Sequence, residues 1–308
     1  MGFAIRAISS EFGEIQISLR DQYPDFHNVI SKTGIERVFE TSGSAIELAI
    51  RALNKLFNEN DLGRNEVGCL IYVSQSPSHF LPSGACLLQE SCDLPESIMA
   101  FDLAQGCSGF VQALSLSTKL VEQFKNVVIV CADTYRSKLD PIDRSTSLLF
   151  SDAATATWIS SQPKLNILAE SHLTNGSGSK FLFHKVPAYN EKEFLYMAGA
   201  DVLLFAKKCV PSEIKIALDR CGINSSDVSR WFMHQASKLV LDSLDQRIAP
   251  SGGVERNLEQ IGNTVSSSIP ILLQNRLSDL NEGINVLCGF GVGLSIATLV
   301  IGPNSNGE

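Results

Sequence analysis

The chain has 308 residues, of which 44% are apolar and 19% charged, a balance typical of a folded globular protein. Its formal net charge is −8 and it has no long basic block, which argues against nucleic acid as a partner. No apolar run approaches the roughly 20 residues of a membrane span, and Met1–Ser10 lacks a signal-peptide core. We therefore expect a cytoplasmic protein that does not enter a membrane.

Short apolar runs alternate with helical patterns along the first half of the chain, which predicts an α/β fold. The runs Val67–Val73 and Val127–Cys131 are typical of buried strands. Apolar residues recur at helical spacing in Thr41–Asn58, which predicts a helix capped by Thr41 or Ser42.

The second half repeats this order. A helical pattern over Asp201–Cys221 is followed by an expected strand, Val228–Met233. Repetition of one supersecondary order indicates a duplicated α/β unit. We predict two related halves packed against each other, residues 1–160 and 161–308.

Each half also closes with a phenylalanine-led turn before a β-rich run, at Phe150 and at Phe290. The segment Asn175–Tyr189 is rich in glycine, serine and aromatic residues, which favours a loop that joins or covers the halves. We expect the tail Gly302–Glu308 to be frayed.

A candidate nucleophile lies at Cys107. An apolar start at Phe101 leads into a tight Gly-Cys-Ser-Gly segment, and a helical pattern begins near Phe110. A cysteine at a helix N-terminus meets unpaired N–H groups and the positive end of the dipole, which favours the thiolate. The alternative is a small buried cysteine that packs a turn. Because no cysteine shows zinc-site spacing, we expect no metal site.

Two further segments carry polar residues of interest. His234 stands where the expected strand Val228–Met233 ends, although a core histidine satisfied by a hydrogen bond would fit equally. Asn263 lies in a small polar stretch before an apolar helical run, Ile271–Leu280, where a turn or cap would also explain it.

Several short motifs resemble, in order and spacing, the thiolase superfamily, and most closely the ketoacyl synthase III (FabH-like) condensing enzymes. The matching motifs are Thr33–Arg37, Leu81–Cys86, the Cys107 elbow, Asp140–Thr146, Leu149–Asp152, Met197–Gly199, His234–Ala236, Gly262–Thr264 and Gly289–Gly293. The resemblance implies a duplicated five-layer αβαβα sandwich, in agreement with the two halves.

The resemblance also implies a mechanism. Cys107 would take an acyl group from a coenzyme A or acyl carrier protein thioester, with the N–H groups of Cys107 and Val292 as the oxyanion hole. His234 and Asn263 would stabilise the enolate formed when a malonyl-type thioester loses CO₂. No metal or redox cofactor is then required.

Further roles follow from the same resemblance. Phe150, Leu195, Met197 and Phe290 would line the acyl pocket. Leu81 would cross the interface of a homodimer and cap the partner's pocket.

The thioester carrier-binding positions depart from the family pattern. Arg144 matches the arginine that, together with a tryptophan, sandwiches adenine of coenzyme A, but the tryptophan position is Asn28. Lys32 stands where the family has arginine.

The basic patch for an acyl carrier protein is thin, since Leu204 and Leu239 occupy two of its expected basic positions. Lysines remain nearby at Lys207, Lys208 and Lys238. The glycine-rich turns are altered as well: Val292 and the run Ser151–Thr155 replace glycines. These departures favour a specialised enzyme of a secondary pathway over the initiator of fatty acid synthesis.

Two alternatives to condensation stay open. One is an acyltransferase that passes the acyl group from Cys107 to an alcohol, amine or thiol; the presence of Asn263 argues against it. The other is a non-catalytic scaffold subunit; the complete set of cysteine, histidine and asparagine argues against that.

Overall fold

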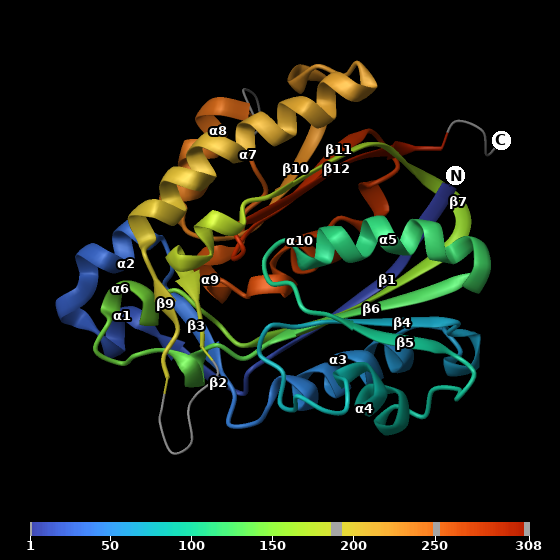
Figure 1. The fold of residues 1–308 in the computed structure, drawn as a ribbon, viewed down its shortest axis with the longest axis horizontal. Coiled ribbons are helices and arrows are strands. Elements are labelled where there is room, and N and C mark those ends of the chain that lie inside the picture. The colour runs from blue at the N-terminus through green and yellow to red at the C-terminus, as the bar shows by residue number, and fades with distance from the viewer. Residues whose placement is uncertain (1, 186–192, 249–252, 305–308) are drawn as a thin grey trace.

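The computed structural model describes residues 2–185, 193–248 and 253–304. Its elements form five layers, helix–sheet–helix–sheet–helix (Figure 1). The helices are α1 (Leu19–Gln22), α2 (His27–Thr33), α3 (Ala45–Glu59), α4 (Gly84–Ser91), α5 (Gly109–Phe124), α6 (Arg144–Ser147), α7 (Gly199–Cys221), α8 (Lys238–Ile248), α9 (Leu258–Ile261) and α10 (Ser268–Gln274). The strands are β1 (Gly2–Phe12), β2 (Ile15–Ser18), β3 (Arg37–Glu40), β4 (Cys69–Val73), β5 (Met99–Leu103), β6 (Asn126–Asp133), β7 (Ala153–Thr174), β8 (Leu182–Phe183), β9 (Tyr196–Met197), β10 (Val228–Met233), β11 (Ile284–Gly291) and β12 (Ser295–Pro303).

Strand β7 connects the two sheet layers. The strand order is β10-β11-β12-β7-β6-β4-β5, and β1 also pairs with β7. The first part of β7, residues 153–160, pairs with β6, whereas residues 165–174 pair with β12. The boundary expected between residues 160 and 161 therefore falls inside this strand.

Three apolar clusters hold the layers together. One packs α7 and α8 on the sheet of β10, β11 and β12, and another packs α3 and α4 on the opposite sheet. The third surrounds α5 and α10, which lie between the sheets. Cys107 belongs to the first cluster although it lies just before α5, so its thiol stands where the central layer meets the outer helices.

The helix expected over Thr41–Asn58 forms, but its predicted cap is wrong. The helix begins at Ala45, with Ser44 and Glu47 in a reciprocal capping box. The hydroxyls of Thr41 and Ser42 donate instead to the carboxylate of Glu14, a partner far away in the sequence.

The other expected elements differ mainly at their ends. The prediction of β10 is confirmed at both ends, and β4 begins two residues later than expected. The helical run expected to reach Leu280 ends at Gln274, and a 3-10 turn follows at Leu277–Asp279. The expected loop over Asn175–Tyr189 contains a 3-10 helix and β8; its residues 186–189 lie outside the described residues.

The C-terminal end is more regular than expected. Strand β12 continues to Pro303 and pairs there with β7, so frayed structure at Gly302 was a wrong prediction. Residues 305–308 lie outside the described residues. Within the described part of the chain, no helix is both long enough and apolar enough to cross a membrane, and no group of three or more histidine, cysteine or acidic side chains is placed to hold a metal ion.

Candidate active site

Cys107 lies on the turn between β5 and α5, two residues before the first residue of α5. The turn is fixed to the second half of the chain, because the hydroxyls of Ser108 and Ser295 lie 2.9 Å apart. Gly291 approaches from β11: a Cβ atom there would stand 3.0 Å from the Cys107 sulfur. The absence of a side chain at Gly291 therefore leaves space at the Cys107 sulfur.

Opposing effects act on the Cys107 thiol. Burial raises its pKa to about 12, and the neighbouring Asp133 carboxylate raises it as well. Hydrogen bonds from the backbone N–H groups of Cys107 and Val292 lower it. Burial therefore opposes the preference for the thiolate that the helix N-terminus is expected to give.

Asp133, at the end of β6, links the two halves near Cys107. One carboxylate oxygen accepts from Gln75 N (2.9 Å) and Ser76 Oγ (3.2 Å), and the other accepts from Ser266 Oγ (2.5 Å). Burial raises the pKa of Asp133 to about 6, while these donors lower it. The carboxylate thus ties the loop after β4 to the turn that follows Asn263.

His234 follows β10 directly and is 2% exposed. Its Nδ1 lies 2.8 Å from Ser268 Oγ, and its ring meets the Phe290 ring edge-on at 5.5 Å. Burial lowers the pKa of His234 to about 3, so the imidazole is neutral at physiological pH. Sequence reasoning missed Ser268, because a serine at a helix start is usually read as a cap.

Asn263 is held by its backbone and by its side chain. Its N–H donates to Leu149 O and its carbonyl accepts from Ser151 N, both at 2.9 Å. The side-chain Oδ1 accepts from Val265 N at 3.0 Å. Because this oxygen is engaged, the amide nitrogen is the end of the side chain that can donate to a ligand.

Cys107, His234 and Asn263 line one cavity of about 210 Å³. Five other residues expected at the site also line it: Lys32, Phe150, Met197, Phe290 and Val292. Sequence reasoning missed Tyr135, Leu182 and the residues of α7 that complete the walls. No local pattern marks those positions, since each comes from a different part of the chain.

Two residues expected to line an acyl pocket do not line this cavity. Leu195 is buried, but it lines a second, neighbouring cavity of about 650 Å³. Leu81 is 87% exposed and lines neither cavity of the single chain. Any contribution of Leu81 to a pocket therefore requires a second copy of the chain.

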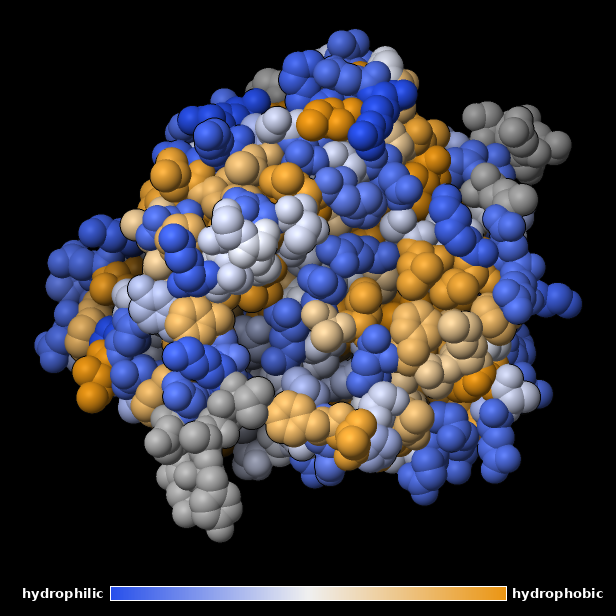
Figure 2. Space-filling view, in the orientation of Figure 1, coloured by the Kyte–Doolittle hydropathy of each residue, from blue (hydrophilic) through white to orange (hydrophobic). Residues whose placement is uncertain are grey.

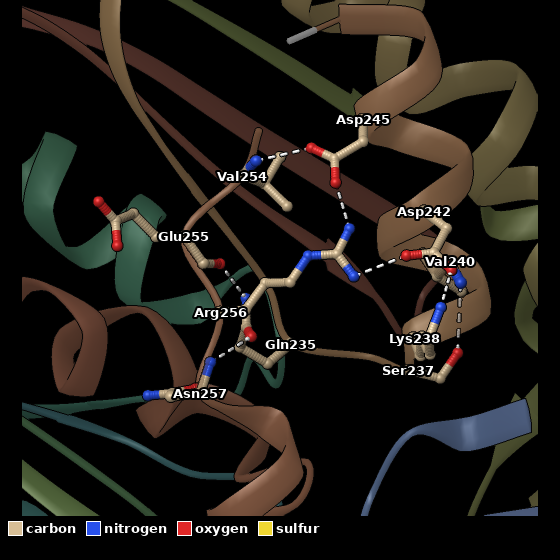
Figure 3. Close-up of polar contacts among 10 residues, drawn as sticks. All are labelled: Gln235, Ser237, Lys238, Val240, Asp242, Asp245, Val254, Glu255, Arg256 and Asn257. Atoms are coloured by element: carbon tan, nitrogen blue, oxygen red, sulfur yellow. Dashed lines mark hydrogen bonds and ion pairs between the residues drawn. The ribbon is translucent and has the colours of Figure 1, made fainter. Parts of the chain in front are cut away.

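The rim of the cavity near α8 is held by charged groups (Figure 3). The guanidinium of Arg256 donates to Asp242 at 2.7 Å and also to Asp245, so it bridges two turns of α8. Lys238, expected at the carrier-binding site, forms an ion pair with Asp242. A Cβ atom added to Gly34 would stand 2.5 Å from the Cβ of Lys238. Gly34 has no side chain and takes the left-handed conformation (φ 70°), so α2 can approach α8 closely.

Arg144 has an aromatic environment that the sequence did not reveal. Its guanidinium carbon lies 4.6 Å from the centroid of the Tyr23 ring and 5.6 Å from that of Phe26. Asn28, at the position where the family has tryptophan, is exposed on α2. The chain's own rings therefore contact the guanidinium that the resemblance assigns to adenine.

Exposed leucines lie on the outer helices, where apolar side chains are visible over the α7–α8 region (Figure 2). Leu204 and Leu239 are 65% and 51% exposed, and Leu239 lines the mouth of the cavity. A partner that docks at this mouth would meet an apolar surface with lysines around it.

Comparisons with known proteins agree on one family. The models of the N-terminal and C-terminal parts of 3-oxoacyl-[acyl-carrier-protein] synthase III match residues 101–176 and 218–302. The β-ketoacyl-[acyl-carrier-protein] synthase III of Lactococcus lactis is 30% identical over 297 residues, 89% of each chain, and that of Streptococcus pneumoniae is 32% identical over 294 residues, again 89% of each.

A solved structure shares the fold. The 2.1 Å crystal structure of a 3-oxoacyl-(acyl-carrier-protein) synthase III superposes with a TM-score of 0.89 and 30% identity, covering 98% of this chain and 99% of that one. The expected thiolase-like five-layer sandwich is thereby confirmed. The chain belongs to the 3-oxoacyl-[acyl-carrier-protein] synthase III family of condensing enzymes.

Proposed function

We propose that this chain performs a decarboxylative Claisen condensation, with Cys107 as the nucleophile and His234 and Asn263 as the groups that stabilise the enolate. The observation that carries the proposal is the meeting of these three side chains in one cavity, with the N–H of Val292 at the sulfur. The substrates are thioesters of coenzyme A or an acyl carrier protein, and no metal or redox cofactor takes part.

The first step transfers an acyl group to Cys107. The Cys107 sulfur attacks the thioester carbonyl, and the N–H groups of Cys107 and Val292 stabilise the oxyanion. The C–S bond to the carrier then breaks. The proton that Cys107 gives up leaves with the carrier, whose departing thiolate becomes a thiol.

The Ser268 hydroxyl is compatible with both neutral forms of His234. It lies within hydrogen-bond reach of both His234 Nδ1 and Val265 O (3.1 Å). When the hydroxyl donates to the carbonyl, Nδ1 carries the hydrogen and Nε2 is an acceptor. When it donates to Nδ1, Nε2 carries the hydrogen and can donate to a ligand.

The second step uses the donating form. A malonyl-type thioester enters, and His234 Nε2–H and the Asn263 amide donate to its carbonyl oxygen. The bond to the carboxylate breaks, CO₂ leaves, and the electron pair forms the stabilised enolate. Its carbon attacks the acyl-Cys107 carbonyl, and the C–S bond breaks to release a β-ketoacyl thioester.

The function is tested by incubating the protein with an acyl thioester and a malonyl thioester. CO₂ release with a β-ketoacyl product supports condensation. Acyl-Cys107 that passes its acyl group to alcohols or amines without CO₂ release would show a heteroatom acyltransferase instead. Absence of both acyl-enzyme and CO₂ would show a scaffold subunit.

We further propose a specialised role in which coenzyme A is bound weakly and a dedicated carrier protein delivers one substrate. Asn28 offers no ring to adenine, Arg144 is covered by Tyr23 and Phe26, and the cavity mouth presents Leu239. An aromatic–base stack contributes roughly 1–3 kcal/mol, or about one to two decades of affinity. Asn28→Trp is therefore expected to lower KM for acetyl-CoA about tenfold.

The control for Asn28→Trp is acetyl-pantetheine, which has no adenine and should keep its KM in the variant. Steady-state kinetics of both substrates measure the effect. Efficient turnover of acetyl-CoA by the unaltered enzyme, with no gain in the variant, would contradict weak coenzyme A binding.

We also propose a C₂ homodimer in which Leu81 reaches the partner's acyl pocket. Strand β5 ends the strand order of the sheet, Met99 on it is 46% exposed, and Phe80 and Leu81 are 79% and 87% exposed close by. An open strand edge beside apolar side chains favours pairing with a second copy. Leu81→Ala should extend acceptance to longer or branched starters, whereas Leu81→Trp should restrict it to the shortest.

Size-exclusion chromatography with light scattering reports the dimer, which should persist in both variants because one side chain is a small part of such an interface. Competition among acyl-CoAs of different length and branching reports which starter acyl groups the enzyme accepts. A monomeric wild type would refute the dimer, and a starter profile indifferent to both substitutions would remove Leu81 from the pocket.

A further inference from the structure

The turn that follows Asn263 contains a strained residue. Val265 has a φ of 52°, in the left-handed region that a β-branched side chain rarely adopts. Such a conformation persists only where surrounding contacts hold it. The N–H of Val265 donates to Asn263 Oδ1 at 3.0 Å, so the strained residue also sets the direction of the Asn263 amide. Whatever holds Val265 in this conformation therefore bears on the decarboxylation step.

Asp133 holds the residue that comes directly after Val265. Its carboxylate Oδ2 accepts from the hydroxyl of Ser266 at 2.5 Å and from the N–H of Ser266 at 3.4 Å. Asp133 is 0% exposed and Ser266 is 1% exposed. With a pKa of about 6, the carboxyl is mostly ionised at neutral pH, and an ionised acceptor makes a stronger hydrogen bond than a neutral one. This double contact anchors the strained turn on β6.

The backbone of Asn263 and that of His234 have anchors of their own. The N–H and carbonyl of Asn263 form hydrogen bonds of 2.9 Å to the segment between α6 and β7, and the N–H of His234 donates to Cys288 O at 3.0 Å. Release of Ser266 would therefore leave both backbones in place. It would free the N–H of Val265, and with it the orientation of the Asn263 amide.

The other carboxylate oxygen of Asp133 binds a segment beside Cys107. This oxygen accepts from Gln75 N at 2.9 Å. The Gln75 side chain lies against Gly106, where an added Cβ atom would stand 2.4 Å from Gln75 Oε1. One buried carboxylate therefore holds both a segment next to the sulfur and the turn that orients the Asn263 amide.

We propose that Asp133 is a positioning residue for the decarboxylation step. Through Ser266, its carboxylate holds Val265 in the left-handed conformation. The N–H of Val265 then orients the Asn263 amide toward the substrate. The inference rests on the proposed function, in which Asn263 donates to the developing enolate. Acyl transfer to Cys107 does not use this amide and is therefore independent of the anchor.

The first test is Ser266→Ala, which removes the hydroxyl donor to Asp133. Release of labelled CO₂ from a malonyl thioester should fall about tenfold, because a misplacement of about 1 Å can lower a rate on the order of 10²-fold and the expected shift is smaller. Formation of acetyl-Cys107, followed by intact-protein mass spectrometry, should keep its rate. Unchanged CO₂ release in this variant would overturn the inference.

A double-mutant cycle separates positioning from a general loss of structure. In an Asn263→Ala background the amide is already absent, so the addition of Ser266→Ala should cause no further loss of CO₂ release. An equal loss in both backgrounds would show that Ser266 supports the fold and does not act through Asn263, which would also overturn the inference.

Asp133→Asn tests the carboxylate itself. The amide carries no charge and presents hydrogens to one of the two sets of donors, so both anchors weaken and CO₂ release should fall at least as far as in Ser266→Ala. If Asp133→Asn forms no acyl-enzyme, Ser266→Ala and its cycle decide the question.

The matched control is Ser76→Ala. The Ser76 hydroxyl donates to the other oxygen of Asp133 at 3.2 Å, so its removal leaves the anchor of Ser266 intact. The ratio of CO₂ release to acetyl-Cys107 formation should stay unchanged. A fall in this ratio equal to that in Ser266→Ala would contradict a role specific to the turn.

The outcomes separate this inference from the proposed function. Absence of CO₂ release from the unaltered enzyme would overturn the proposed function. An unaltered enzyme that releases CO₂, matched in rate by Ser266→Ala and Asp133→Asn, would overturn only the role of Asp133.

Discussion

Replacing Cys107 with alanine will abolish the acyl-enzyme and, with it, condensation. The chain has seven other cysteines, but in the proposed mechanism only Cys107 has its sulfur beside the N–H of Val292 in a cavity that also holds His234 and Asn263. Without a nucleophile there is no covalent intermediate to receive the enolate. Intact-protein mass spectrometry after exposure to an acyl thioester should show no mass increase in Cys107→Ala.

The matched control for this variant is Cys86→Ser. Cys86 is an exposed free cysteine on α4, open to non-specific acylation. Removing it should leave a single adduct, which peptide mapping should place on Cys107. An adduct that persists in Cys107→Ala at Cys86 or at the buried Cys131 would refute the assignment of the nucleophile.

His234→Ala and Asn263→Ala should each spare acylation in large part but reduce malonyl decarboxylation about 10²–10³-fold. Each substitution removes one hydrogen-bond donor to the developing enolate, and loss of one such donor typically has an effect of this size. Release of labelled CO₂ from malonyl thioester measures the second step, and acyl-enzyme formation measures the first. Unchanged malonyl turnover in either variant would contradict this division of roles.

Asn263→Asp is the conservative control, because it keeps the shape of the side chain but replaces the amide donor with an acceptor. It should lose decarboxylation as Asn263→Ala does. The pH profile adds an independent test. Burial lowers the pKa of His234 from its ordinary 6.5 to about 3, so the ring stays neutral from pH 5 to 8. The decarboxylation rate should therefore show no titration of this histidine in that range.

The catalytic candidates could be found from the sequence because each lies at a junction with a clear local pattern. Cys107 stands between an apolar strand and a helical repeat, and His234 follows an apolar run whose bounds the structure confirms as β10. Asn263 was the weakest of the three by local pattern, since turn asparagines are common; the order of the motifs identified it.

The sequence could not show which distant side chains stand beside these groups. Tyr23 and Tyr135 gave no local signal, yet one contacts Arg144 from more than a hundred residues away and the other lines two cavities. The misplaced helix cap has the same origin: Thr41 and Ser42 are suitable caps by type, but Glu14 binds their hydroxyls. Partners that are set by tertiary packing override local preference.

The long strand β7 makes the two related halves mutually dependent. Residues 153–160 complete one sheet layer and residues 165–174 complete the other, while β1, from the start of the chain, runs beside both parts. Separating the halves would leave each with an unpaired backbone edge and an exposed apolar face. We therefore expect the two halves to unfold together, since each depends on β7 for the pairing of its sheet layer.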